Sequence, residues 1–247
     1  KSWWSHLLLN LKMMPSLNMC GFLYSGADTG GFGGDTSREL LLRWLAVSLF
    51  TPLMRNHSAI GTKRQECYCF RNVEDFQTVI SLRYRLLPYL YSEYMKAALE
   101  QDMLIRPLAF VYPKDSRARS IEDQLLVGEG LMMAPVLEKG ARGRTVYLPE
   151  PMTEVRFGRE GFSVQEAGPG ERSVSVPLNE VVFYIRQGKL VPVGKPAAST
   201  AELDLMDVEL LGSGTAYQQY VDDGFTRDCT LERCVVRRRT QSGSAAV

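Results

Sequence analysis

Residues 21–34 read GFLYSGADTGGFGG, a short apolar run followed at once by a glycine-rich turn. This pattern predicts a buried strand over Gly21–Ser25 that ends in a loop over Gly26–Gly34. Asp28 lies in that loop, and α/β folds place their active sites in loops at the C-terminal ends of parallel strands. From the residue pattern alone, Asp28 is equally well explained as the cap of a turn.

The same arrangement follows once more along the chain. A helix that Thr36 or Ser37 can cap leads into an apolar run over Phe50–Met54, which we interpret as a second strand, and His57 comes just after it. Two strand-end loops therefore each offer a polar side chain. A lone histidine is more often a satisfied structural residue, and only the partnership with Asp28 makes His57 a candidate site residue.

Helical periodicity flanks these two segments. Apolar residues recur at helical spacing over Trp4–Leu17, and Pro15 is expected to bend or end that helix. A long helix is predicted to begin at Asn72, where Asp75 three residues later resembles a capping box, and Pro88 predicts a kink inside it.

The pattern changes between Gln101 and Gln124, where helical spacing gives way to short apolar runs separated by Gly and Pro turns. Such runs are typical of a β-sandwich, and a last portion from about Lys195 has strand signals of its own. The residues from Thr240 to Val247 are small and polar and are expected to fray. The predicted strands are Gly130–Val136, Arg144–Leu148, Val155–Phe157, Ser173–Val176, Val181–Ile185, Asp207–Leu211 and Ala216–Tyr220.

Composition narrows the classes of function. The chain has 247 residues, 45% of them hydrophobic, which is enough for a sizeable core. Its 29 Lys and Arg residues balance 28 Asp and Glu residues, so it has no field suited to nucleic acid or an acidic membrane surface. No apolar stretch approaches the roughly 20 residues of a membrane helix. We therefore expect a neutral substrate and neither nucleic acid nor a membrane as a partner.

The cysteines form an odd, scattered set. Cys20, Cys67, Cys69, Cys229 and Cys234 fit free thiols in a reducing compartment better than a disulfide framework, so a cytoplasmic location is expected. The C-x-C pair has no CxxC partner or nearby second histidine, and a zinc site is therefore not predicted.

Several short motifs occur in a fixed order and together resemble glycoside hydrolase family 31, the α-glucosidase and α-xylosidase group. The resemblance covers nearly the whole chain. It is carried by Gly26–Phe32, Arg43-Trp44, Pro52, Arg55-Asn56-His57, the run RYRLLPYLY at 83–91, Arg106-Pro107, Asp123-Gln124, Gly128, Ala134-Pro135-Val136, Val146–Pro149, Ile185–Gly188 and Tyr220–Gly224.

The resemblance implies an α/β plus β fold, in which a (β/α)8 TIM barrel is followed by a proximal and a distal β-sandwich. Residues 1–104 would be the last quarter of the barrel, with Gly21–Ser25 as strand 7 and Phe50–Met54 as strand 8. Residues 105–194 would form the proximal sandwich, and residues 195–247 the truncated start of the distal one. The chain begins without a methionine, and we expect it to be a piece of a longer polypeptide.

The resemblance also implies that the catalytic residues and some of the substrate-binding residues lie in different parts of the polypeptide. The family uses an aspartate nucleophile and an aspartate acid/base, and both are expected upstream of Lys1, so no catalytic residue is expected in this chain. The pocket residues that it implies here are Asp28, Phe32 and His57, which would bind the non-reducing glucosyl ring. Arg55 would lie beside His57 and orient Asp28 or, as we favour, support the loop.

These implications predict a retaining, exo-acting α-glucosidase that needs no metal or organic cofactor. Its partners would be an α-glucoside oligosaccharide and the N-terminal remainder of the enzyme, with homo-oligomerisation left open. An α-xylosidase, an α-transglucosylase and a non-catalytic carbohydrate-binding fragment are alternatives, although the form of the loop at Ala27–Thr29 is closer to that of α-glucosidases. Gln65–Tyr68 replaces a segment that carries Pro-Trp in many relatives, which leaves the outer subsites open.

Overall fold

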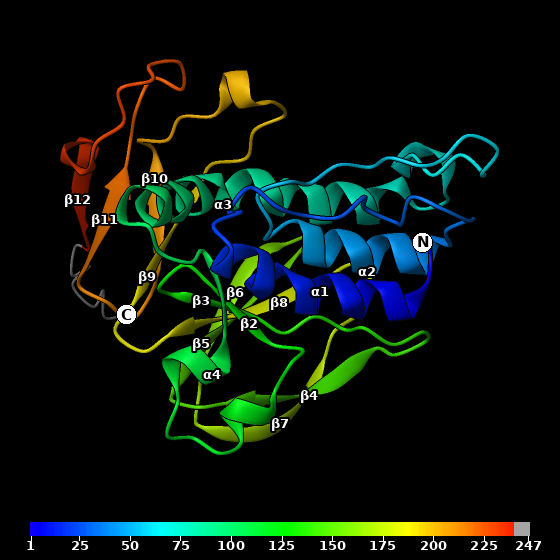
Figure 1. Cartoon of the computed structure of the whole chain (residues 1–247), viewed down its shortest axis with the longest axis horizontal. Coiled ribbons are helices and arrows are strands. Elements are labelled where there is room, and N and C mark those ends of the chain that lie inside the picture. Colours follow the sequence, from blue (N-terminus) through cyan, green and yellow to red (C-terminus); the bar gives the residue numbers. More distant parts are fainter. Residues whose placement is uncertain (240–247) are drawn as a thin grey trace, which may run out of the picture.

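The computed structural model describes residues 1–239, so the fraying predicted for 240–247 lies outside the described residues. Three helices form a layer over one face of a six-stranded sheet (Figure 1). They are α1 (Trp4–Met19), α2 (Arg38–Ser48) and α3 (Val73–Glu100). A one-turn helix α4 (Leu108–Val111) and short 3-10 turns at Cys67–Cys69, Ala118–Ser120, Thr200–Glu202 and Leu231–Arg233 complete the helical elements of this part of the chain.

The helices begin and end largely as the sequence predicts. Ser37 caps α2, because its hydroxyl accepts a hydrogen bond from the Leu40 amide at 3.2 Å. α1 continues through Pro15 to Met19, so the expectation that this proline could end the helix is wrong. α3 likewise continues through Pro88 and is long enough to contact both the six-stranded sheet and the last strands.

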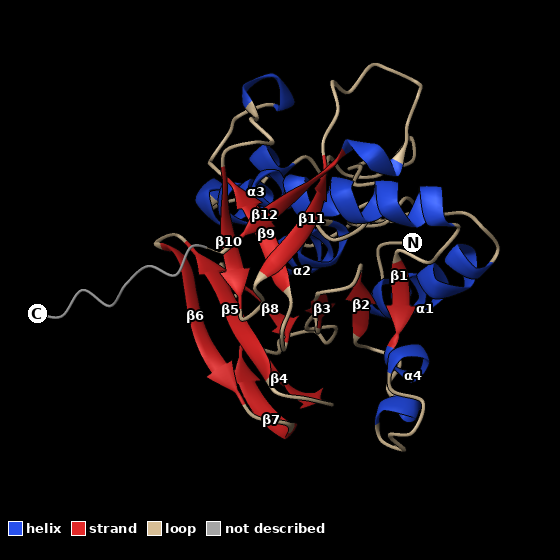
Figure 2. Ribbon diagram, turned by 90° about the vertical axis from the view of Figure 1, so that its left-hand side faces the viewer, coloured by secondary structure: helices blue, strands red, loops and turns tan. Residues whose placement is uncertain are grey.

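The central sheet has the strand order β1-β2-β3-β8-β5-β6, and every neighbouring pair is antiparallel (Figure 2). A separate antiparallel pair, β4 with β7, lies on the side of the sheet away from the helices. The strands are β1 (Ile105–Pro107), β2 (Leu125–Val127), β3 (Leu131–Met133), β4 (Gly143–Leu148), β5 (Met152–Gly158), β6 (Gly161–Ala167), β7 (Gly170–Ser175) and β8 (Val181–Arg186).

Side-chain alternation divides the core into two layers. In β8, Phe183 and Ile185 face the helices, whereas Val182 and Tyr184 face β4 and β7. β2 and β3 alternate in the same way, since successive side chains of a strand point to opposite faces. The sheet is therefore covered by helices on one face and by β4 and β7 on the other. The packing of the sheet on β4 and β7 is sandwich-like, whereas the helical cover of the other face is not part of the predicted sandwich.

The last strands pack against α3. β9 (Leu190–Gly194) pairs with β10 (Val208–Gly212), and β11 (Ala216–Tyr220) pairs with β12 (Cys234–Arg238). The Ser92 hydroxyl on α3 accepts a hydrogen bond from the Tyr220 amide at 3.1 Å. The phenol of Tyr91 donates to the Asp222 carboxylate at 2.7 Å.

The two strands predicted over Gly21–Ser25 and Phe50–Met54 are absent from the described residues, and this prediction is wrong. The two segments do lie side by side, joined by a hydrogen bond from the Leu53 amide to the Ser25 carbonyl at 3.2 Å. Just beyond their ends, one parallel bridge joins Asp28 and Arg55. A parallel strand needs a ladder of such bonds with its neighbours. Each segment has only these few contacts with the other, so neither becomes a strand.

Candidate substrate-binding site

An ion pair joins the two loops that carry the predicted site residues. Arg55 donates from Nε and Nη2 to Oδ1 of Asp28, at 3.1 and 2.7 Å. The Thr29 amide also donates to the Arg55 carbonyl at 2.8 Å, so the pairing is supported by the backbone on both sides. The resemblance implies two roles for Arg55, orienting Asp28 or, as favoured, supporting the loop. Its guanidinium contacts the Asp28 carboxylate directly, which fits the orienting role, and its carbonyl accepts a bond from the other loop, which fits the supporting role.

Two aromatic rings lie side by side on the same pair of loops. The centroids of Phe32 and His57 are 5.3 Å apart, with their planes tilted by 34°. Phe32 is 47% exposed and His57 is also exposed, so both rings are open to a ligand. The Ala59 amide donates to the Phe32 carbonyl at 2.8 Å, which ties the loop after His57 to the glycine-rich loop.

A cavity of about 280 Å³ opens beside these groups. Its volume is close to the lower end, roughly 300 Å³, of small-molecule sites, which suits one compact ligand unit rather than a long chain. Asp28, Phe32 and Arg55 line it. His57 is not a lining residue, but its ring packs against that of Phe32. The remaining lining residues are Lys1, His6, Asn10, Gly26, Ala27, Gly31, Trp44 and Leu53.

His6 and Asn10 are lining residues that sequence reasoning missed. Both lie one turn apart on α1 and face the cavity. The apolar stripe of α1 indicates which face is buried, but it carries no signal that the adjoining polar residues border a cavity formed by loops far along the chain.

Glycine is required in the loop where backbones approach closely. A Cβ placed on Gly31, whose φ is +90°, would come within 2.5 Å of the Lys1 carbonyl carbon and the Ser2 nitrogen. The Ser2 amide in turn donates to the Gly33 carbonyl at 2.9 Å. The glycine-rich loop therefore packs directly on the backbone that leads into α1, at a distance that a side chain would prevent.

Arg83 on α3 holds the segment that leads into the His57 loop. Its guanidinium donates to the carbonyls of Leu49, Thr51 and Pro52 at 2.8, 2.7 and 3.0 Å. Burial lowers the pKa of Arg83 to about 10. The long helix thus anchors the beginning of the loop by charge-assisted hydrogen bonds rather than by a strand ladder.

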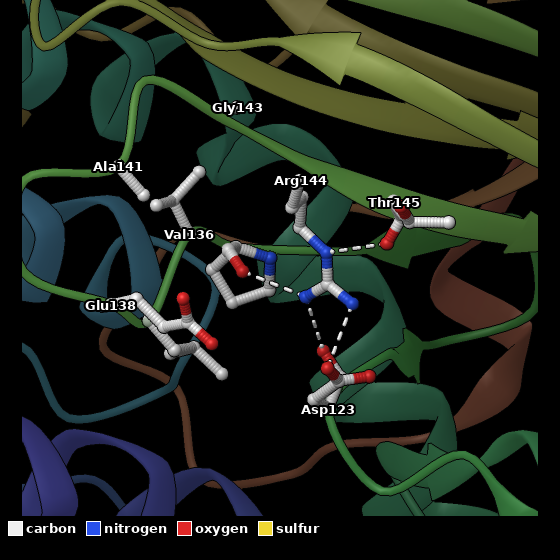
Figure 3. Close-up of a pocket in the computed structure, with 9 residues that line it drawn as sticks. Asp123, Val136, Glu138, Ala141, Gly143, Arg144 and Thr145 are labelled. Carbon is white, nitrogen blue, oxygen red and sulfur yellow. Dashed lines mark hydrogen bonds and ion pairs between the residues drawn. The ribbon is translucent and has the colours of Figure 1, made fainter.

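A second cavity, of about 250 Å³, lies at the edge of the sandwich-like part (Figure 3). Arg144 lines this cavity, and all of its guanidinium nitrogens donate hydrogen bonds. Nε donates to the Thr145 carbonyl, and Nη1 to the carbonyls of Pro135 and Asp123. Nη2 donates to the Asp123 carboxylate. All three guanidinium nitrogens therefore serve to hold the surrounding loops, and we assign no substrate to this cavity.

Within residues 1–239 there is no grouping of three His, Cys, Asp or Glu side chains that could bind a metal ion. Over the same residues no helix combines the length and the apolar character that crossing a membrane requires.

Two family models match the chain, one after the other. The glycosyl hydrolases family 31 TIM-barrel domain matches residues 1–93, and the glycosyl hydrolase family 31 C-terminal domain matches residues 101–191.

Two curated relatives and a solved structure of similar fold are named as glucosidases. Alpha-glucosidase 2 of Bacillus thermoamyloliquefaciens is 34% identical over 92% of this chain and 29% of its own length. Lysosomal alpha-glucosidase of Mus musculus is 32% identical over 91% of this chain and 26% of its own. A structure of the ER glucosidase II heterodimeric complex superposes with a TM-score of 0.81 at 28% identity, covering 96% of this chain and 27% of that one.

The chain thus spans less than a third of the length of these relatives. Because one relative is named lysosomal and another structure is that of an ER enzyme, the cytoplasmic location expected from the cysteines stays a prediction.

Proposed function

Because this chain belongs to glycoside hydrolase family 31, we propose that it forms the C-terminal part of a retaining, exo-acting α-glucosidase that removes terminal α-linked glucose from oligosaccharides. The observation that carries the proposal is the convergence of Asp28, Arg55 and Phe32 on one cavity of about 280 Å³, with His57 packed on Phe32.

The site residues of this chain bind the sugar rather than break its bond. Both hydrogen bonds from Arg55 go to Oδ1 of Asp28, so the other carboxylate oxygen can accept hydrogen bonds from sugar hydroxyls. The imidazole of His57 adds a second polar group, and the Phe32 ring can pack on an apolar sugar face. Such groups fix the ring in position while other residues carry out the chemistry.

The two catalytic aspartates lie upstream of Lys1 in the complete polypeptide. In a retaining enzyme one ionised carboxylate attacks the anomeric carbon, while the second group, a protonated carboxylic acid, gives its proton to the departing oxygen. The two carboxyl groups are about 5 Å apart. Water, deprotonated by the second group, then releases the sugar from the first. The isolated chain should therefore hydrolyse no α-glucoside.

Exposed apolar side chains on the segment before Gly26 support the proposal that another part of the same enzyme packs against this chain. Phe22 and Tyr24 are each 65% exposed, although they were expected in a buried strand. Beside Tyr24 lies a mainly apolar cavity of about 170 Å³, lined also by Leu87, Leu90 and Tyr94 of α3. The remainder of a barrel would cover this surface and supply the missing strand partners.

The test uses the full-length polypeptide encoded with the residues upstream of Lys1. We expect it to hydrolyse p-nitrophenyl α-glucoside faster than the α-xyloside and to release the α-anomer first, as seen by proton NMR. Release of the β-anomer would refute retention. A preference for the xyloside, transfer to a sugar acceptor, or binding without turnover would replace the proposal by an α-xylosidase, a transglucosylase or a binding module, respectively.

A further inference from the structure

We propose that Gln65 is a positioning residue whose side-chain amide locks the 26–34 loop to the 55–70 loop and thereby sets the distance between Phe32 and His57. Gln65 is 3% exposed, although it lies in an otherwise largely exposed loop. Its Nε2 donates to the His57 carbonyl at 3.0 Å and has the Thr29 and Gly31 carbonyls at 3.3 and 3.4 Å. One amide thus bridges both loops.

The orientation of this amide follows from its neighbours. Carbonyl oxygens only accept hydrogen bonds, so the NH2 group must face them, and a flipped amide would bring Oε1 against three acceptors. Oε1 consequently points to the other side, where it is buried without a hydrogen-bond partner among residues 1–239. This orientation leaves one acceptor unsatisfied, whereas the flipped one would leave three carbonyls facing an oxygen and the NH2 group without an acceptor.

Contacts on both sides limit the movement of the bridge. The Gln65 carbonyl accepts a hydrogen bond from Asn56 Nδ2 at 2.8 Å, which closes the second loop on itself. On the other side, the Thr29 hydroxyl bonds to Ser48 on α2 at 3.0 Å, so the first loop is anchored to a helix. Gly30 lies between Thr29 and Gly31, and a Cβ on it would be in van der Waals contact with the side-chain nitrogen of Gln65, at 3.6 Å.

The Gln65 side chain bonds to the backbone of one site residue and to that of the residue next to the other. Gly31 immediately precedes Phe32, and the carbonyl at 3.0 Å is that of His57 itself. Since both rings are exposed, their 5.3 Å separation depends on the positions of the backbones that carry them rather than on burial of the side chains. Fixing those backbones in advance preorganises the binding groups, which is the purpose that the proposed function gives to the bridge.

The chain offers a sensitive probe, because His57 and His6 are its only histidines. In proton–carbon NMR of the histidine-labelled full-length enzyme, the His57 ring signal is identified as the one that His57→Ala removes. It is shifted by the ring current of Phe32, and a Phe32→Leu variant gives the unshifted position. Gln65→Leu should move the His57 signal toward that position.

A matched control is Gln124→Leu, since Gln124 is equally buried and its amide bonds to the Tyr147 carbonyl at 2.8 Å, far along the chain in the sandwich-like part. It should leave the His57 signal in place. An unmoved His57 signal in Gln65→Leu would overturn the inference. So would global unfolding of both Gln65→Leu and the shape-matched Gln65→Met while Gln124→Leu stays folded, because Gln65 would then be a general core residue.

This readout contains no substrate, so its outcome is independent of whether the proposed glucosidase activity is correct. In the full-length enzyme, Gln65→Leu should lower kcat/KM for p-nitrophenyl α-glucoside at least tenfold, with most of the change in KM, because the binding groups lose their alignment. Gln124→Leu should stay within twofold of the unaltered enzyme. Unchanged kinetics with a moved His57 signal would mean that the bridge orders the loops without serving the substrate.

Discussion

Arg55 gives two hydrogen bonds to one carboxylate oxygen of Asp28, at 2.7 and 3.1 Å, across two loops separated by the whole of α2. This pair is one of several direct links between the two predicted site loops, and it lies on the wall of the 280 Å³ cavity. A planar guanidinium can make both bonds at once, whereas an ammonium group cannot reproduce that geometry.

Arg55→Lys should therefore weaken substrate binding without unfolding the protein. We expect kcat/KM of the full-length enzyme to fall by about tenfold, about 1.4 kcal/mol, while the free energy of unfolding changes by less than about 0.5 kcal/mol because the pair is partly exposed. Arg64→Lys, an exposed arginine in the same loop that pairs with Glu66, is the control. A fall in stability equal to the fall in activity would contradict the orienting role.

The close approach at Gly31 predicts a difference between two neighbouring glycines. Gly31 and Gly34 have nearly the same φ, +90° and +94°, but a Cβ on Gly34 has no atom within 4 Å. Gly34→Ala should cost only the backbone strain of about 1–2 kcal/mol. Gly31→Ala adds a backbone collision and should cost at least about 2 kcal/mol more. Urea unfolding of the two variants measures the difference, and equal losses would show that the contact is easily relieved.

The buried Glu93 of α3 predicts a large loss of stability far from the site. Its carboxylate accepts hydrogen bonds from the Tyr217 phenol at 2.7 Å and the Glu129 amide at 2.8 Å, and it pairs with Lys96 at 2.5 Å. Glu93→Ala leaves a nearly buried ammonium without its partner, which should cost about 3–5 kcal/mol. Tyr217→Phe should cost only about 1–2 kcal/mol. Similar losses from both in urea unfolding would refute this account of the cluster.

The same cluster predicts how stability responds to high pH. Burial raises the pKa of the Tyr217 phenol well above its ordinary range, so the folded protein holds a proton that the unfolded chain releases near pH 10. This contribution is fully present below pH 10 and is lost as pH rises further, by about 1.4 kcal/mol for each pH unit. Between pH 8 and pH 11, Tyr217→Phe should lose less stability than the unaltered chain. An identical loss would show that Tyr217 does not contribute.

The periodic parts of the fold could be predicted from sequence. The 3.6-residue spacing after Asn72 and the alternation over Val181–Ile185 depend on burial of one face, which the residues themselves encode. β2 and β9 were missed because a short, wholly buried run has no alternation to detect, and β6 because its residues are mostly exposed. The strand predicted over Gly21–Ser25 does not form, because strand formation depends on neighbouring strands that the local sequence does not specify.

The site was predicted in part for a related reason. Asp28 and His57 were paired through the order of the elements, and the loops do meet even though the two strands before them do not form. The sequence marks Gln65 only as part of a segment that differs from many relatives, since a polar residue in a loop gives no sign that it is buried. Its role depends on carbonyls of three residues that come together only in the folded chain.

The most direct test of the account is His57→Ala in the full-length enzyme, with the melting temperature and kcat/KM measured on the same sample. His57 is exposed, so folding should barely change. His57→Ala removes a hydrogen bond to a sugar hydroxyl that strengthens in the transition state. The activation free energy that corresponds to kcat/KM should therefore rise by about 2–4 kcal/mol, and kcat/KM should fall accordingly. A lower melting temperature with near-normal kcat/KM would instead mean that His57 is an anchor of the 55–70 loop and not a substrate ligand.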